Sequence, residues 1–236
     1  MGAILIALIF WQLLSLYIHQ SILLVGPIEV LKQLGLLVRD LSFWQVTWYT
    51  MRHIIGGFFL GLIAGLILGS LSGRFPALET LLWPWMACVK SVPVASMIVI
   101  LLIWLRAGNL SIFISFLIVL PVIYQNTLSG VRARDKQMLE MAQGFRIHGL
   151  RKLWYIDLPM MKPFLLSAVS TAAGMAWKAG VAAEIIGTPQ GSIGQRLYLD
   201  KTYLDTADLL AWTVVLVLLS VVFEKLLVGI LKKILP

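Results

Sequence analysis

The chain has 236 residues, of which 60% are apolar and only 13% are charged, and its net charge is +8. A soluble domain carries about 25% charged residues, so this composition excludes an ordinary soluble protein and indicates one that is embedded in a membrane. The excess of basic residues bears on topology, because basic residues collect on the cytoplasmic side of membranes. The single cysteine, Cys88, excludes an intramolecular disulfide.

Six apolar stretches approach the length of about 20 residues that a membrane-spanning helix needs. They predict an all-α membrane protein with about six transmembrane helices, in a single domain over residues 1–236. The stretches are residues 3–18, 48–71, 81–105, 110–131, 163–185 and 209–231. The first lacks the basic start and the cleavage site of a signal peptide, so we expect it to remain as an uncleaved helix.

The second stretch contains glycines at every fourth position. Gly57, Gly61, Gly65, Gly69 and Gly73 would form one stripe without side chains on a helix, along which two helices can approach closely. The stripe is interpreted either as static packing within the subunit or as a surface that slides during a conformational change.

Prolines interrupt two of the predicted spans. Pro84 and Pro93 lie in the third span and Pro121 lies in the fourth. Each removes a backbone hydrogen bond and favours a kink. Kinked helices suit a protein with a central pathway, although they also occur in static membrane helices.

An even number of spans places both termini on the same side. The segment of residues 132–162, together with the chain's C-terminal end, carries the larger share of the basic residues. The positive-inside rule therefore predicts that this segment and both termini face the cytoplasm. We expect a multi-pass protein of the cell membrane, that is, the inner or cytoplasmic membrane.

The segment of residues 132–162 is too long for a simple turn. Met138, Met141, Ala142 and Phe145 recur at helical spacing, and a second apolar run begins at Leu153. This pattern predicts two short helices outside the membrane with an apolar ridge. The ridge fits a groove on another protein, or else it caps the chain's own bundle, and the residues alone do not separate these readings.

This segment resembles the coupling loop of permease subunits of binding-protein-dependent ABC importers. The family pattern is Glu-Ala-Ala, then glycine, then an apolar residue and Leu-Pro. Glu140-Met141-Ala142 and Leu158-Pro159 match it at the family's spacing, but the expected glycine falls at Arg146. The residues that the resemblance assigns to ATPase coupling are Glu140, Met141, Ala142, Gly144, Phe145, Arg146, Gly149, Leu158 and Pro159.

Two further motifs resemble the nitrate/sulfonate/taurine branch of this family. They are Lys90-Ser91-Val92-Pro93 in the third span, and Ala182-Ala183-Glu184 in the fifth span with Gly191 and Gly194 in the outer loop after it. With them, the similarity covers about residues 48–223. It implies a type I importer architecture with coupling helices between spans 4 and 5.

The resemblance also implies partners. Two permease subunits, either identical copies or paralogues, would line the pathway, and a cytoplasmic ATPase dimer would use ATP and Mg. An extracytoplasmic solute-binding protein would deliver the solute. The chain itself contains no G-x-x-x-x-G-K-[ST] motif, so we expect a transport subunit without enzymatic activity or a cofactor of its own. Membrane lipid is a further expected partner, and nucleic acid is not.

Charged residues within predicted spans are candidates for function. Lys178 could neutralise a charge on another helix or subunit, attract an anionic solute, or extend towards an interface. Its spacing from Glu184 does not favour a pair within one helix. The candidate pathway residues are Lys90, Ser91, Pro93, Trp177, Lys178 and Glu184. The solute could be an anion such as nitrate, a sulfonate or bicarbonate, or a vitamin precursor.

Two other functional classes remain as alternatives. A secondary transporter driven by an ion gradient would need inverted repeats and carboxylates at the midplane, and neither is evident. A membrane enzyme would need a converging polar site, whereas no G-x-S-x-G motif occurs and the three histidines are scattered without a metal-ligand pattern.

Overall fold

The computed structural model describes residues 2–18 and 24–235, and the domain expected over residues 1–236 is helical throughout these ranges, with no strand in them. Met1, residues 19–23 and Pro236 lie outside the described part. In chain order the elements are α1 (Gly2–Ile18), α2 (Pro27–Leu37), α3 (Leu41–Arg74), α4 (Pro76–Ser91), α5 (Val94–Leu101), α6 (Ala107–Arg132), α7 (Lys136–Gly144), α8 (Leu150–Lys152), the π-helical η1 (Leu153–Asp157), α9 (Leu158–Gly187), α10 (Ile193–Tyr203) and α11 (Thr206–Ile234).

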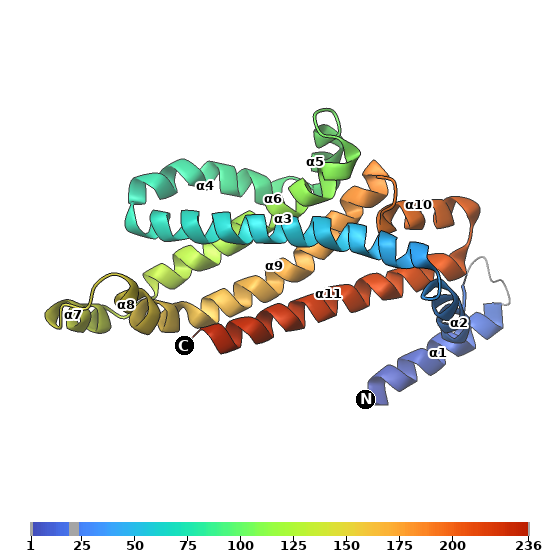
Figure 1. Ribbon diagram of the computed structural model, residues 1–236, viewed down its shortest axis with the longest axis horizontal. Coiled ribbons are helices and arrows are strands. Elements are labelled where there is room, and N and C mark those ends of the chain that lie inside the picture. The colour runs from blue at the N-terminus through green and yellow to red at the C-terminus, as the bar shows by residue number, and fades with distance from the viewer. Residues whose placement is uncertain (1, 19–23, 236) are drawn as a thin grey trace.

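Four long helices form the body of the molecule. α3, α6, α9 and α11 run lengthwise, with α6 packed against α3 and α9, and α9 packed against α11 (Figure 1). α3 has 34 residues, which corresponds to about 50 Å of helix and exceeds a hydrocarbon core of about 30 Å. The side chain of Asp40 begins it by accepting a hydrogen bond from the Ser42 amide at 3.0 Å.

By length and composition, four helical runs among the described residues can cross a membrane. They are α3, α6, α11 and the continuous run from η1 through α9, Leu153–Gly187. The count rises to five if the pair α4 and α5 forms one broken span. The protein is therefore multi-pass, and the described residues do not confirm the predicted number of six spans.

The third predicted span, residues 81–105, is broken at one of the two prolines where a kink was expected. α4 and α5 are bent by 101° at the break between Ser91 and Val94. Pro93 has no amide hydrogen, and its ring disfavours helical geometry at the preceding residue. Val92 accordingly has an extended backbone, with φ −73° and ψ 130°.

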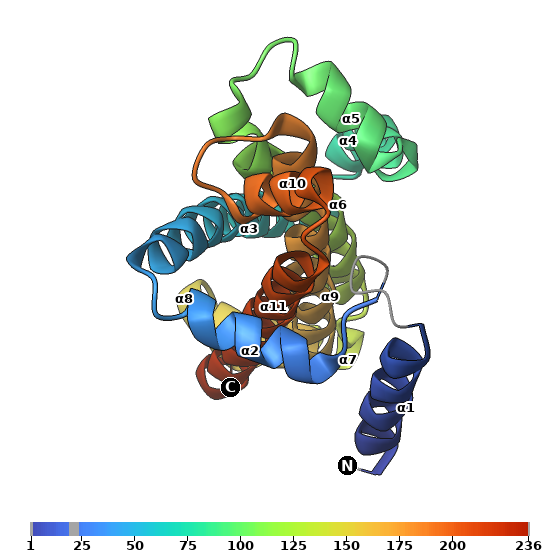
Figure 2. The same cartoon turned by 90° about the vertical axis from the view of Figure 1, so that its right-hand side faces the viewer.

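The first predicted span, residues 3–18, coincides with α1 but is shorter than the other spans. α1 has 17 described residues, Gly2–Ile18, which is at the short end of the range of about 17–25 residues for a membrane-spanning helix. Most of its described side chains are exposed, and Trp11 packs against the cluster of Val25, Val30 and Ala211. Figure 2 shows α1 beside α2 and apart from the main bundle.

The glycine stripe lies between α3 and α6. Gly57, Gly61, Gly65 and Gly69 are buried. A Cβ on Gly65 would lie 2.7 Å from the Ile123 Cβ, and one on Gly69 would lie 2.7 Å from the Thr127 Cβ. The two backbones approach so closely that only glycine fits along this stripe.

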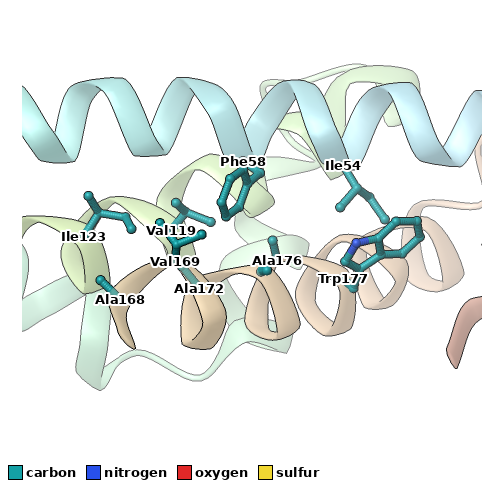
Figure 3. Packing of buried hydrophobic residues seen from close by; sticks show 10 residues of the cluster. Ile54, Phe58, Val119, Ile123, Ala168, Val169, Ala172, Ala176 and Trp177 are labelled. Atoms are coloured by element: carbon teal, nitrogen blue, oxygen red, sulfur yellow. The ribbon is translucent and has the colours of Figure 1, made fainter. Parts of the chain in front are cut away.

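The core lies where α3, α6 and α9 meet. Ile54 and Phe58 from α3 point towards the alanine-rich face of α9, whose residues include Ala172 and Ala176 (Figure 3). Small residues on α9 leave room for these large side chains, and Phe58 also packs edge-on against Phe223 of α11, with ring centroids 5.2 Å apart.

The two ends of the bundle carry different segments. α7, α8 and the C-terminus lie at one end, and α2 and α10 lie at the other (Figure 1). The C-terminus lies at the end that carries α7 and α8, and α1 lies near α2.

Candidate functional site

The α7–η1 segment (residues 136–157) is the first candidate site, and α7 is capped at both of its ends. The carboxylate of Asp135 accepts a hydrogen bond from the Gln137 amide at 2.8 Å. At the other end, the Ile147 amide donates to the Ala142 carbonyl at 2.8 Å. These contacts fix the start and the end of a nine-residue helix that is too short to be stable by itself in water.

Arg146 occupies the position at which the family pattern has glycine. Its φ is +53°, a left-handed conformation that favours glycine and costs most other residues energy. Gly149 is also left-handed, with φ +63°. The turn that the glycine provides in the family pattern is therefore present here, although the residue differs. The arginine itself gave no signal for this conformation, and only its alignment with the glycine of the family pattern pointed to it.

Large apolar side chains are exposed along the α7–η1 segment. Phe145 is 76% exposed and Tyr155 is 72% exposed. Soluble surfaces rarely present so many apolar groups together unless they mark an interaction site. The members of this exposed apolar group are Met138, Met141, Phe145, Leu153, Trp154 and Tyr155.

Ala142 and Glu140 have opposite environments. The side chain of Ala142 is fully buried within the chain, so it faces the protein's own packing and not the surface. Glu140 and Gly144 are exposed. Substituting Ala142 would therefore disturb the internal packing of the α7–η1 segment, and the exposed apolar group offers cleaner sites for testing a contact.

An ion pair joins the α7–η1 segment to the bundle. Arg134, just after α6, places an Nη1 nitrogen 2.7 Å from the Oδ1 oxygen of Asp157, and its Nε donates to the Val131 carbonyl at 2.8 Å. Arg132 also pairs with Glu79 of α4. The segment is thereby fixed to α6 at one end and to the start of α9 at the other.

α9 begins earlier than the predicted span 163–185. Leu158 and Pro159 lie at its start, where a missing amide hydrogen costs little, and the π-helical turn of η1 continues the helix back to Leu153. One helical run therefore connects the α7–η1 segment directly to the opposite end of the bundle.

The structure does not bring the six candidate pathway residues together on one face. Trp177 is 3% exposed and Glu184 is fully buried. Lys178 is exposed on α9, while Lys90, Ser91 and Pro93 are exposed where α4 meets α5. Trp177 and Glu184 thus belong to the interior of the single chain.

Lys178 belongs to an exposed stripe on α9 that includes two hydroxyl residues. Ser167, Thr171 and Met175 precede it at spacings of three or four residues and are also exposed. Lys178 lines a groove of about 440 Å³ between α9 and α11. Within the described chain, no carboxylate lies within 4.0 Å of its ammonium group. Ser167 and Thr171 were not among the candidate pathway residues, although their helical spacing from Lys178 was a usable signal.

Glu184 forms a buried polar contact that the sequence analysis did not foresee. Its Oε2 oxygen accepts hydrogen bonds from the Thr50 hydroxyl at 2.8 Å and from the Gly194 amide at 3.3 Å. The hydroxyl of Thr50 in turn accepts from the Ile193 amide at 2.9 Å. Three helices, α3, α9 and α10, meet at this carboxylate.

Comparison with known proteins places the chain in a transport family. Residues 57–235 match the family model described as "Binding-protein-dependent transport system inner membrane component". The riboflavin transport system permease protein RibX of Chloroflexus aurantiacus is 26% identical over 95% of this chain and 87% of its own length. The taurine transport system permease protein TauC of Escherichia coli is 23% identical, over 92% and 80%. The putative aliphatic sulfonates transport permease protein SsuC of Bacillus subtilis is 28% identical, over 57% and 49%. Because the family model covers most of the chain, this protein belongs to the permeases of binding-protein-dependent ABC transporters.

Proposed function

We propose that this chain forms the membrane translocation pathway of an ATP-driven importer for a small solute, and that the α7–η1 segment is its coupling loop. The single observation that carries this proposal is the exposed apolar group on the α7–η1 segment, which connects α6 to α9 and whose two flanks are joined by the Arg134–Asp157 ion pair. A helix of this kind fits a groove on a partner. Its attachment to two membrane helices allows a partner's movement to reach the bundle.

The partner at the coupling loop would be a cytoplasmic ABC ATPase dimer that binds ATP and Mg. The loop end of the bundle would face the cytoplasm, because Arg132, Arg134, Lys136, Arg151 and Lys152 gather there. A second permease copy or a paralogue would complete the pathway, and a solute-binding protein would dock at the opposite end. The cell membrane is the corresponding location.

The exposed stripe of α9 is the proposed pathway face. A lysine in the middle of a membrane costs about 2.5–3.5 kcal/mol on insertion scales, and Lys178 has no carboxylate partner among the described residues. A solute with a negatively charged group would compensate this charge. The permeases named for taurine and aliphatic sulfonates support such a solute, and we propose a small anion or sulfonate.

The test of the coupling loop is copurification of the ATPase with a surface variant. Phe145→Asp places a charge on a side chain that is 76% exposed, so the helix should still fold. We expect the ATPase to copurify in about equal amount with the wild type and at least tenfold less with Phe145→Asp. Tyr203→Asp is the matched control, because Tyr203 is 78% exposed at the opposite end of the bundle.

Three results have clear meanings. Loss of the ATPase with Phe145→Asp alone supports the coupling loop. Equal copurification with both variants, at equal membrane levels, places the ATPase contact elsewhere. If no ATPase accompanies even the wild type, the importer assignment fails, and transport driven by an ion gradient becomes the function to test.

A further inference from the structure

Glu184 is a buried carboxylate to which the proposed function assigns no role. It lies in the last turns of α9 and has no exposed surface. An ionised or polar group in such a place is costly unless hydrogen bonds satisfy it. Two donors reach its Oε2 oxygen, the Thr50 hydroxyl and the Gly194 amide, and its Oε1 oxygen has no hydrogen-bond partner among the described residues.

Thr50 makes this contact a relay between helices. Its hydroxyl donates to Glu184 at 2.8 Å and accepts from the Ile193 amide at 2.9 Å. One hydroxyl of α3 therefore bonds the end of α9 and the start of α10 at once. Hydrogen bonds in a chain polarise one another, so loss of the hydroxyl should weaken both attachments together.

The start of α10 is shaped to meet the carboxylate. Ser192 caps the helix by accepting from the Gln195 amide at 3.0 Å, and the free amides of Ile193 and Gly194 then point at Thr50 and Glu184. The positive end of the helix dipole favours a carboxylate here. A Cβ on Gly194 would lie 2.6 Å from the Glu184 carbonyl carbon, so this approach requires glycine.

The opposite end of α9 is attached by a second carboxylate. Asp157, at the start of the helix, pairs with Arg134 beside the α7–η1 segment. The 30 residues of α9 span about 45 Å. Figure 1 shows this helix running from the end with α7 and α8 to the end with α10. A displacement of α9 at one end must therefore act on the contacts at the other.

We propose that Glu184 is a positioning residue that transmits movement of α9 to α10 through Thr50 and the amides of Ile193 and Gly194. This inference rests on the proposed function for its role in transport, because movement of α9 would start at the coupling loop. α10 lies across the end of the bundle away from that loop (Figure 2). Glu184 would thus link the ATP-driven step to the end at which solute enters.

The local part of the proposal is tested by amide hydrogen exchange on the purified chain in lipid nanodiscs. Glu184→Met removes the acceptor at similar volume, and Thr50→Val removes the hydroxyl. We expect exchange at the first amides of α10 to rise about tenfold or more in either variant. The double variant should add little, since the two residues act through one contact. Thr50→Ser keeps the hydroxyl and should exchange like the wild type.

Glu224→Met is the matched control. Glu224 is another carboxylate within a spanning helix, but it accepts its hydrogen bond from Ser170 and joins α11 to α9. Its loss should leave exchange in α10 unchanged. Unchanged exchange in Glu184→Met and Thr50→Val, or an equal rise in Glu224→Met, overturns the proposal.

The transport part is tested on the assembled transporter. We expect Glu184→Met and Thr50→Val to lower solute uptake at least fivefold while the ATPase still copurifies and hydrolyses ATP, with Thr50→Ser restoring uptake. A loosened α10 with normal uptake overturns the transmitting role. If the wild type assembles with no ATPase, the proposed function fails, yet the exchange experiment still decides whether Glu184 positions α10.

Discussion

At the scale of single residues, burial differs between adjacent residues that were both candidates for the pathway. Trp177 and Lys178 are adjacent, yet the first is 3% exposed and the second lies on the surface of α9. Helical geometry turns successive side chains by about 100°, so only one of them can face the core. Lys178 is therefore available to a solute or a second subunit, while Trp177 packs against Phe223, with ring centroids 6.2 Å apart.

Lys178→Met tests the charge on the proposed pathway face. Methionine keeps the length of the side chain and removes the ammonium group, so uptake of an anionic solute should fall about tenfold or more, whereas Lys178→Arg should retain part of it. Uptake would be measured with taurine and alkanesulfonates in cells that contain equal amounts of each variant. Unchanged uptake in Lys178→Met would remove Lys178 from the pathway.

Arg146→Gly tests the left-handed turn at the end of α7. This conformation costs an L-residue about 1–2 kcal/mol, which glycine would not pay. Glycine has greater freedom in the unfolded chain, however, and this offsets about 0.5–1 kcal/mol of the stabilisation. A net stabilisation of about 0.5–1 kcal/mol is therefore expected.

The measurement for Arg146→Gly is limited proteolysis within residues 136–157, which should become slower by a small factor. Arg146→Val is the opposite control, because a β-branched residue tolerates this conformation poorly. Faster cleavage of the glycine variant would show that the arginine side chain itself holds the turn.

At the scale of elements, close packing between α3 and α6 depends on one face of α3. Gly65 is buried against Leu120 and Ile123, whereas Gly56, on the same helix, has open space where a Cβ would be. Both positions have the same helical backbone and the same residue type. They differ only in their neighbours, which makes them a matched pair.

Gly65→Ala should lower the stability of the bundle, and Gly56→Ala should not. The added Cβ would lie 2.7 Å from the Ile123 Cβ, and overpacking of this kind costs about 1–3 kcal/mol. The measurement is the thermal unfolding midpoint of each variant in detergent. Equal midpoints for the two variants would mean that α3 and α6 can separate without loss of stability, as the sliding interpretation of the stripe requires.

At the scale of the whole molecule, α9 is the most buried of the long helices, whereas α11 and α1 leave much of their apolar surface exposed. In its most apolar 18-residue window, 56% of the residues are buried, compared with 11% for α11. α1 is largely exposed and contacts the rest of the chain mainly through α2. Apolar exposure of this extent suits contact with lipid or with another membrane protein.

Much of the architecture could be predicted from local patterns. Apolar length identified the regions of α3, α6, α9 and α11, and the periodicity of Met138, Met141 and Phe145 predicted α7, because these signals arise within one element. Local patterns could not predict whether Arg146 adopts the left-handed backbone conformation that favours glycine. The backbone there depends on the hydrogen bonds that close the end of α7.

The sequence by itself determined that this chain is a helical membrane protein with a polar, amphipathic segment between two spans, because composition and periodicity are local properties. The sequence indicated a kink at Pro93, but tertiary structure alone decided that α4 and α5 lie at 101° and that Glu184 meets Thr50 and Gly194. These outcomes depend on how distant helices pack, since burial and hydrogen bonding between segments remote in the chain leave no periodic signal within either segment.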